Sequence, residues 1–198
     1  MRNFNKAALL VSAFGLILGA CAPHPPRERA AEPPSATRIA LVDYLEVLQT
    51  VDVDIGGRRL PFLFDTAGGA TLVTPAVADA IGCKPFGRAT GFRHDGSRID
   101  VPRCGPVDLR MDGLPLRAEA GVFDLMALLP PGAQPLGGIL SLHTLGNRPW
   151  TLDMSVRTLT LETPESLVQR TAEMHAIQVR PSTQGGGASL DLFMKVDA

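Results

Sequence analysis

The chain has 198 residues, of which 45% are hydrophobic and 20% are charged, and its formal net charge is -1. This length allows one ordinary core-bearing domain with additional tails. A nearly balanced charge gives no electrostatic basis for binding nucleic acid or an anionic surface. Aromatic residues make up only 5% of the chain, so the sequence offers no stacking platform either.

The first twenty residues have the pattern of a secretory signal. Arg2 and Lys6 precede an apolar run over residues 7–18, which is shorter than a membrane-spanning helix requires, and small residues follow it. Residues 18–21, Leu-Gly-Ala-Cys, resemble the bacterial lipobox, in which Cys21 becomes the acylated first residue of the mature protein. The alternative is an ordinary signal peptide with a coincidental cysteine.

The lipobox implies a location and a tether. Acyl chains on Cys21 would attach the protein to a membrane surface, and Ala22 at the next position resembles the outer-membrane sorting pattern. We therefore expect a lipid-anchored protein of the bacterial cell envelope that faces the periplasm, at the outer membrane. Residues 21–36 contain five prolines among charges without periodicity, which is typical of an extended tether.

The first strand patterns of the domain lead to a single carboxylate. Apolar residues alternate with Asp over residues 51–55, Gly-Gly follows at 56–57, and an apolar return strand over residues 60–64 ends at Asp65. A hydroxyl and small residues come next, before the apolar pattern resumes at Leu72. Such a strand–turn–strand unit places an acid at the base of a cleft, with backbone N–H groups of the turn free to bond it. On these residues alone, Asp65 is equally well explained as an ordinary strand-end residue.

A short helix and a hairpin are predicted next. Thr74 and Pro75 are typical of a helix start, and Gly82 follows the predicted helix over residues 76–81 as its left-handed end residue. Residues 91–101 place an Asp-Gly turn between two strand-like arms. We interpret the Asp of this turn, at position 95, as a turn former and not as a catalytic residue.

The rest of the chain continues in short segments with frequent turn signals. Further strands are predicted at residues 107–111, 114–116 and 122–125, a turn of helix near 141–145, and a closing hairpin of residues 150–154 with 159–161. Many short strands with two short helices indicate an all-β, barrel-like domain.

The C-terminal segment has two interpretations. A short helix is predicted from Thr163 to about residue 174, and Gly-Gly-Gly at 185–187 forms a linker or turn. Apolar residues then alternate over residues 190–196, a strand pattern that echoes residues 49–55. This strand is either the first of a second, missing half, or a terminal strand that pairs with the domain or with a partner chain.

Two stretches together resemble the retropepsin-like aspartic peptidases. That family has an apolar pair followed by Asp-Thr-Gly-Ala or Asp-Thr-Gly-Ser, and later a Gly-Ile-Leu-Gly stretch before a short helix. Here the stretches are Leu-Phe-Asp-Thr-Ala-Gly at residues 63–68 and Gly-Gly-Ile-Leu-Ser-Leu at residues 137–142. Ala67 stands where the family has Gly, and Ser141 stands where it has the second Gly. The likeness covers roughly residues 37–163.

The resemblance implies a fold and a reaction. The fold would be an all-β, retropepsin-like closed β-barrel with one or two short helices, in which the hairpin at residues 91–101 is a flap; the alternative is a plain surface hairpin. Asp65 would be catalytic, with Thr66, Ala67 and Gly68 as its supporting loop. In this chemistry two carboxyl groups share one proton, activate water and protonate the scissile carbonyl oxygen, without a cofactor.

Alanine at position 67, where the family has glycine, affects the backbone energy if the family's glycine adopts a left-handed conformation. A residue with a Cβ in a left-handed backbone conformation carries strain of about 1 kcal/mol or more. Gly68 and Gly69 could absorb this strain by shifting the turn one residue. The sequence offers one such Asp, so the second carboxyl group would come from a homodimer or from a second half.

Cys83 and Cys104 are the cysteines outside the signal segment. In an oxidising periplasm we expect one disulfide between them, and two separate buried thiols are the alternative. The four histidines are scattered without ligand spacing, so no metal site is predicted.

The sequence therefore predicts four segments and a peptidase. The segments are a lipoprotein signal peptide at residues 1–20, a tether at 21–36, an aspartic protease domain at 37–163, and a linker with a first strand of a second half at 164–198. The predicted function is an aspartic-type endopeptidase that acts on a peptide or protein substrate as a dimer or pseudo-dimer. The alternatives are a non-catalytic envelope lipoprotein that binds extended peptides by strand addition, and a structural envelope lipoprotein.

Overall fold

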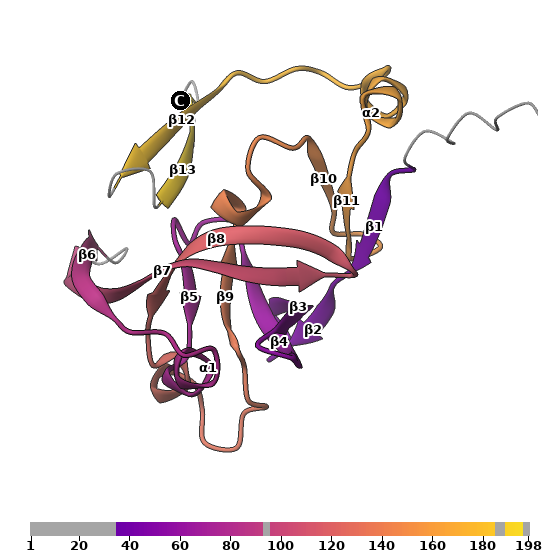
Figure 1. Ribbon diagram of the computed structural model, residues 1–198. Helices are drawn as coiled ribbons and strands as arrows, with labels where there is room; N and C mark the ends of the chain where they lie inside the picture. The colour runs from indigo at the N-terminus through magenta and orange to yellow at the C-terminus, as the bar shows by residue number, and fades with distance from the viewer. Residues whose placement is uncertain (1–34, 93–95, 185–188, 196–198) are drawn as a thin grey trace, which may run out of the picture. The chain divides into compact units, whose positions relative to one another are not determined.

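The computed structural model describes residues 35–92, 96–184 and 189–195. Short strands dominate this part of the chain, with two short α-helices and two single 3-10 turns (Figure 1). The elements are β1 (Thr37–Ala40), β2 (Val42–Tyr44), β3 (Leu48–Ile55), β4 (Arg58–Asp65), β5 (Thr71–Val73), α1 (Pro75–Ala80), β6 (Phe86–Phe92), β7 (Arg98–Met111), β8 (Leu114–Val122), η1 (Leu125–Leu128), β9 (Gly138–Ser141), η2 (Leu142–Leu145), β10 (Trp150–Asp153), β11 (Thr158–Leu161), α2 (Pro164–Thr171), β12 (Val179–Gln184) and β13 (Ser189–Met194). The predicted all-β class is confirmed.

Six strands close into a barrel. Eight strands form one sheet in the order β2-β3-β4-β9-β5-β8-β7-β6, and β3 also pairs with β7. Val53 of β3 lies opposite Met111 of β7, and both side chains are fully buried. This additional pairing joins β3, β4, β9, β5, β8 and β7 into a ring, so the predicted closed barrel is present.

Alternating side chains fill the barrel. Along β3, the side chains of Val51, Val53 and Ile55 are buried, while that of Asp52 is exposed. Successive residues of a strand point to opposite faces, so this alternation directs one set to the core and the other to solvent. Phe62 of β4 is also fully buried in the same hydrophobic cluster.

A second, smaller sheet and the helices complete the domain. β1, β11 and β10 form a separate antiparallel sheet, which contains the predicted closing hairpin. Helix α1 begins at Pro75, as expected, although the side chain of the preceding Thr74 makes no capping hydrogen bond. Gly82 after this helix has a φ of 68°, the left-handed conformation that the sequence predicts.

The strand predicted at residues 122–125 is wrong. β8 ends at Val122, and the 3-10 turn η1 begins at Leu125. The carboxylate of Asp124 accepts a hydrogen bond from the backbone N–H of Ala127, at 3.3 Å. A short acidic side chain that captures a nearby N–H favours a turn over an extended strand, which explains the difference.

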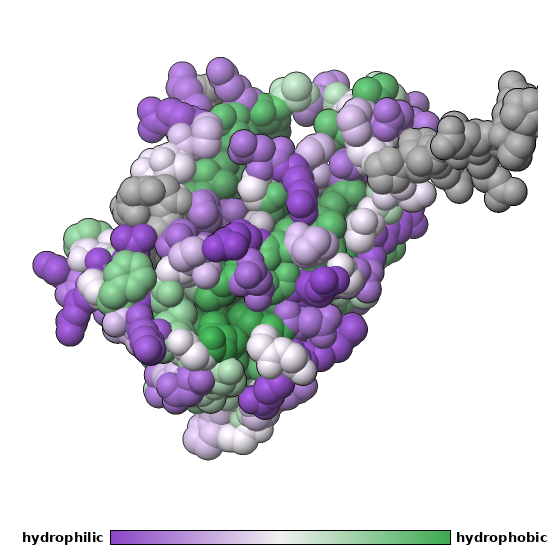
Figure 2. Space-filling view, in the orientation of Figure 1, coloured by the Kyte–Doolittle hydropathy of each residue, from purple (hydrophilic) through white to green (hydrophobic). Residues whose placement is uncertain are grey.

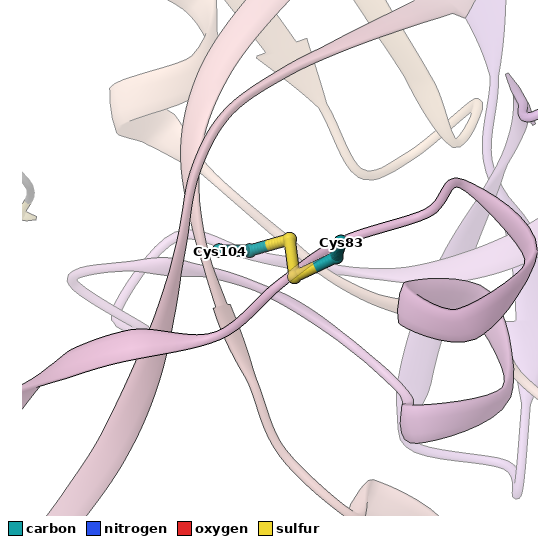
Figure 3. Close-up of a disulfide and its surroundings, with 2 residues drawn as sticks. All are labelled: Cys83 and Cys104. Carbon is teal, nitrogen blue, oxygen red and sulfur yellow. A yellow bond between two sulfur atoms is a disulfide. The ribbon is translucent and has the colours of Figure 1, made fainter.

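A disulfide joins the segment after α1 to β7. The sulfur atoms of Cys83 and Cys104 are bonded, and their Cα atoms lie 5.7 Å apart (Figure 3). The bond closes a loop with a sequence separation of 21 residues. Loop closure of this size contributes about 3 kcal/mol to stability in the chain-entropy account.

Candidate active site

Asp65 is positioned by three neighbouring strands. It is the last residue of β4, and Ser141 lies opposite it on the parallel strand β9. β5 pairs antiparallel with the other side of β9. The chain therefore crosses the end of β9 between β4 and β5, and it does so within residues 66–70. This crossing places the Asp65 carboxylate on a tight loop at the end of buried strands.

Two backbone N–H groups bind one oxygen of the Asp65 carboxylate. The amides of Ala67 and Gly68 donate to Oδ1 at 2.9 and 2.8 Å. These two hydrogen bonds fix the orientation of the carboxylate. The second oxygen, Oδ2, accepts no hydrogen bond from the residues that the structure describes, and the side chain is half-buried. Oδ2 is therefore available to a water molecule or to a second carboxyl group.

Position 68 of this loop requires glycine because of a close contact with Asp65. A Cβ on Gly68 would lie 2.5 Å from Oδ2 of Asp65, which is closer than real Cβ contacts. Ala67 is exposed and does not have a positive φ, so its methyl group causes no left-handed backbone strain. The loop accepts alanine where the resembled family has glycine because the close approach occurs one residue later.

A buried network of three hydroxyl groups lies at the base of the loop. Oγ1 of Thr71, at the start of β5, lies 3.1 Å from Oγ of Ser141 and 2.5 Å from Oγ1 of Thr144. The backbone N–H of Ser141 also donates to Thr71, at 3.2 Å. All three side chains are buried. The network joins β5, β9 and η2, and it satisfies the hydroxyl that Ser141 introduces in place of glycine.

The predictions from sequence did not include this network. Its signal is the presence of hydroxyl residues at the ends of short apolar strands, where a buried hydroxyl requires a partner. Their pairing spans about seventy positions along the chain, from Thr71 to Ser141 and Thr144. Sequence pattern alone does not specify partners over such a separation.

We predict that Thr71→Val lowers the free energy of unfolding by about 1–3 kcal/mol, because its removal leaves buried hydroxyl groups without a partner. Denaturant unfolding followed by Trp150 fluorescence measures the change. Thr50→Val is the matched control, because Thr50 is also buried and its hydroxyl makes one long bond of 3.3 Å to the carbonyl of Val42. An equal effect of both substitutions would contradict a special role for the network.

A pocket of about 220 Å³ lies between the loop and the hairpin of β6 and β7. Its walls are mostly small and aliphatic side chains and glycines, and they include Gly68, Gly69, Ala89, Thr90, Ile99 and Val101. The turn of this hairpin, residues 93–95 with the predicted turn former Asp95, lies outside the described residues. Both the loop and the hairpin line this pocket, and the role of the hairpin as a flap stays a prediction.

Two ion pairs lie on or beside this hairpin. Thr90 and Arg98 both donate hydrogen bonds to the carboxylate of Asp100, and these bonds lower the pKa of that carboxyl. Arg103 and Glu119, in the wall of the pocket, form an ion pair of 3.4 Å. Both partners of that pair are partly exposed, so it contributes little to stability.

The remaining predicted site residues are distributed as follows. Thr66 is exposed, and its hydroxyl makes no hydrogen bond within the described part of the chain, so its role in the supporting loop stays a prediction. Cys21 lies outside the described residues. Asp65 is the single carboxylate of its loop. Across residues 35–92, 96–184 and 189–195, no group of three or more His, Cys, Asp or Glu side chains is placed to bind a metal ion.

Many solved structures are similar to this chain, and two of them show the degree of likeness. No protein-family model and no curated protein matches the chain. A retropepsin-like aspartic protease from Rickettsia conorii is 12% identical, with a TM-score of 0.43, and the match covers 64% of this chain and 90% of that one. The retroviral protease-like domain of Ddi1 from Leishmania major is 15% identical, with a TM-score of 0.42, and the match covers 59% and 89%.

Proposed function

We propose that the domain of residues 37–163 is an aspartic-type endopeptidase in which Asp65 is one of two carboxyl groups that share a proton. The observation that supports this proposal is the orientation of the Asp65 side chain. Two backbone N–H groups bind Oδ1, while Oδ2 is left to exchange a proton with water or with a second carboxyl group. The neighbouring apolar pocket suits a side chain of a bound peptide.

The chemistry follows from the pairing of the two acids. Carboxyl groups in contact do not both ionise, because the like charges repel. The ionised group takes a proton from the bound water, and the protonated group donates its proton to the scissile carbonyl oxygen. Water adds to the carbonyl carbon without a covalent enzyme intermediate. The carboxyl group that took the water proton then gives it to the leaving nitrogen as the C–N bond breaks, and a hydroxyl of the tetrahedral intermediate returns a proton to the other carboxylate. The second carboxyl group comes from a second copy of the loop across a two-fold axis, or from a second half.

Cleavage of an unfolded protein substrate tests the proposal. Residues 22–198 are assayed from about pH 3 to about pH 8, a range that spans the carboxylate and neutral regimes. We expect cleavage by the wild-type chain and none by Asp65→Asn, because an amide does not ionise. Equal cleavage by both chains would contradict the proposal. So would the absence of cleavage in a sample that sedimentation shows to be dimeric.

A second candidate function is a peptide-binding module without turnover. It is favoured by the single carboxylate of the loop and by a strand of the same chain that is docked on the loop. Peptide binding without Asp65-dependent cleavage would support this candidate over the peptidase.

We also propose that the domain is anchored to the bacterial envelope through acylated Cys21. Among the described residues, no helix is long and apolar enough to cross a bilayer. Palmitate labelling of cells is expected to label the wild-type protein and the Cys83→Ala control, and to fail for Cys21→Ala, since acylation requires the thiol. Label on Cys21→Ala, or an unlipidated intact mass for the native protein, would contradict the anchor.

A further inference from the structure

The C-terminal hairpin of β12 and β13 lies against the Asp65 loop. The backbone N–H of Leu190 donates to the carbonyl oxygen of Gly69 at 2.9 Å, and the Leu190 side chain packs against the main core. A Cβ added to Gly69 would lie 3.1 Å from Oδ1 of Asp191 and 3.3 Å from Cβ of Ser189. Three successive residues of β13 therefore surround this edge of the loop.

The hairpin does not pair with the barrel strands in the described part of the chain. Residues 172–178, which connect it to α2, are all exposed. β12 and β13 pair with each other along their whole length and with no other strand in the described part of the chain. Three apolar side chains at the end of β13, those of Leu192, Phe193 and Met194, are about half exposed. Figure 2 shows apolar surface among hydrophilic surface at the upper left, where the hairpin lies.

This distribution of contacts makes the hairpin separable from the barrel. Segments with few buried apolar contacts open at low free energy, without global unfolding. The barrel ring of β3, β4, β9, β5, β8 and β7 includes neither strand of the hairpin. Undocking β13 therefore breaks the bond between Leu190 and Gly69 and exposes the Leu190 side chain, while the core strands stay paired.

We propose that the Gly69 edge of the loop is a binding site for an extended peptide strand, and that β13 is its internal ligand. The inference rests on the proposed function, in which this loop belongs to a peptide site. Extended peptides are recognised by main-chain hydrogen bonds to a strand-like edge, with side chains in flanking pockets. β13 presents leucine between serine and aspartate. The ligand class in trans is thus an extended peptide with an aliphatic residue between polar ones.

A tethered ligand competes strongly with a free one. A short flexible connector gives an effective concentration on the order of millimolar. While β13 is docked, the N–H of Leu190 is bonded to the carbonyl oxygen of Gly69. A peptide from another molecule must therefore first displace β13. The hairpin thereby limits access to the site.

Leu190→Pro tests this competition in the full chain. Proline has no N–H and cannot donate to Gly69. The N–H of Leu190 points away from β12, so the substitution removes no hydrogen bond of the hairpin ladder. Leu192→Pro is the matched control. The N–H of Leu192 lies on the same edge of β13 as that of Leu190, and it donates to no backbone carbonyl outside the strands in the described residues.

The probe is a fluorescent synthetic peptide that copies residues 189–194, Ser-Leu-Asp-Leu-Phe-Met. We expect Leu190→Pro to bind it at least about tenfold more tightly than the wild-type chain, and Leu192→Pro to change the affinity by less than about twofold. Equal affinities of Leu190→Pro and wild type would overturn the proposal, and so would the failure of every variant to bind the peptide.

A disulfide lock tests the opposite state. In Gly69→Cys/Ser189→Cys the two Cβ atoms would start about 3.3 Å apart, close to the range of natural disulfides. We expect the oxidised double variant to lose peptide binding and the reduced form to regain it. The reduced form is the reference, and wild type in the same reductant corrects for the opening of Cys83–Cys104. Equal binding in both states would overturn the proposal.

Cleavage assays separate this inference from the proposed function. Each variant is also prepared with Asp65→Asn. Asp65-dependent cleavage together with unchanged peptide affinity in Leu190→Pro overturns the role of the hairpin and leaves the peptidase. Tighter binding in Leu190→Pro, without cleavage by a sample that sedimentation shows to be dimeric, supports the internal ligand and overturns the peptidase.

Discussion

Gly68→Ala is expected to reduce kcat/KM for peptide cleavage by roughly 100-fold, the size of effect that a small misplacement of a catalytic group produces. The added Cβ would meet Oδ2 of Asp65 at 2.5 Å, so the carboxylate or the loop must move. The nearest atoms to this Cβ all belong to Asp65, an end-of-strand side chain outside the barrel core. We therefore expect the melting temperature to change little while activity falls.

Gly138→Ala provides the contrasting variant. A Cβ at Gly138 would collide with the backbone carbonyl of Leu72, between the paired strands β9 and β5. This substitution should lower stability as well as activity, because backbone atoms of a sheet do not move aside cheaply. Wild-type activity in Gly68→Ala would contradict the assignment of Oδ2 to the chemistry.

Replacement of Arg170 by Met is expected to lower the free energy of unfolding by about 3 kcal/mol at neutral pH, because it leaves a buried charge unpaired. The Glu162 side chain is fully buried and accepts hydrogen bonds from Arg170 and from Ser166, while Arg170 is 29% exposed. Ser166 also forms the capping box of α2 with Thr163. The pair therefore connects α2 to the end of β11, and urea unfolding measures its contribution.

The Glu162 carboxylate should also make the stability of the domain depend on pH. Burial raises the pKa of Glu162, but hydrogen bonds from Ser166, Thr151 and Arg170, with the Arg170 charge, lower it by more, so the folded-state pKa lies below the ordinary 4.5. The unfolded chain then binds the proton more readily. The stabilisation that the ionised Glu162 gives to the folded state is fully present at pH values above the ordinary pKa of 4.5. This stabilisation is lost as the pH falls through the lowered pKa of the folded state.

Glu162→Gln isolates this contribution. The variant cannot titrate, so its stability should decline less steeply than that of the wild type as pH falls below about 4.5. Glu165→Gln is the control, because Glu165 is an exposed acid in the first turn of the same helix. Parallel stability profiles for wild type and Glu162→Gln would contradict the account.

The barrel strands and the Asp65 loop were predictable because their signals are local. Alternation over residues 51–55, a Gly-Gly turn and an apolar return strand specify a hairpin within fifteen residues. The pairing of β3 with β7, which closes the barrel, joins residues that are more than fifty positions apart, and no local pattern encodes it. The failed strand at residues 122–125 shows the same limit. One hydrogen bond from the backbone N–H of Ala127 to the Asp124 side chain favours a turn over the strand that the apolar run predicts.

The site was predictable only in part. The sequence places Asp65 at a strand end, but the tolerance of Ala67 depends on which residue approaches the carboxylate, and that is a property of the folded loop. Alternation in residues 190–196 predicts a strand without specifying its partner. The contact between Leu190 and Gly69 depends on three-dimensional proximity across more than one hundred residues.

The most direct test of the central claim, that catalysis needs two carboxyl groups and that one loop supplies one, is a mixing experiment on residues 22–198. Wild-type and Asp65→Asn chains are mixed at constant total concentration and allowed to exchange subunits. If two copies of Asp65 form the site, activity follows the square of the wild-type fraction, and an equal mixture retains about one quarter of the activity. An equal mixture that retains one half would mean that a single chain carries the complete site, which would contradict the claim.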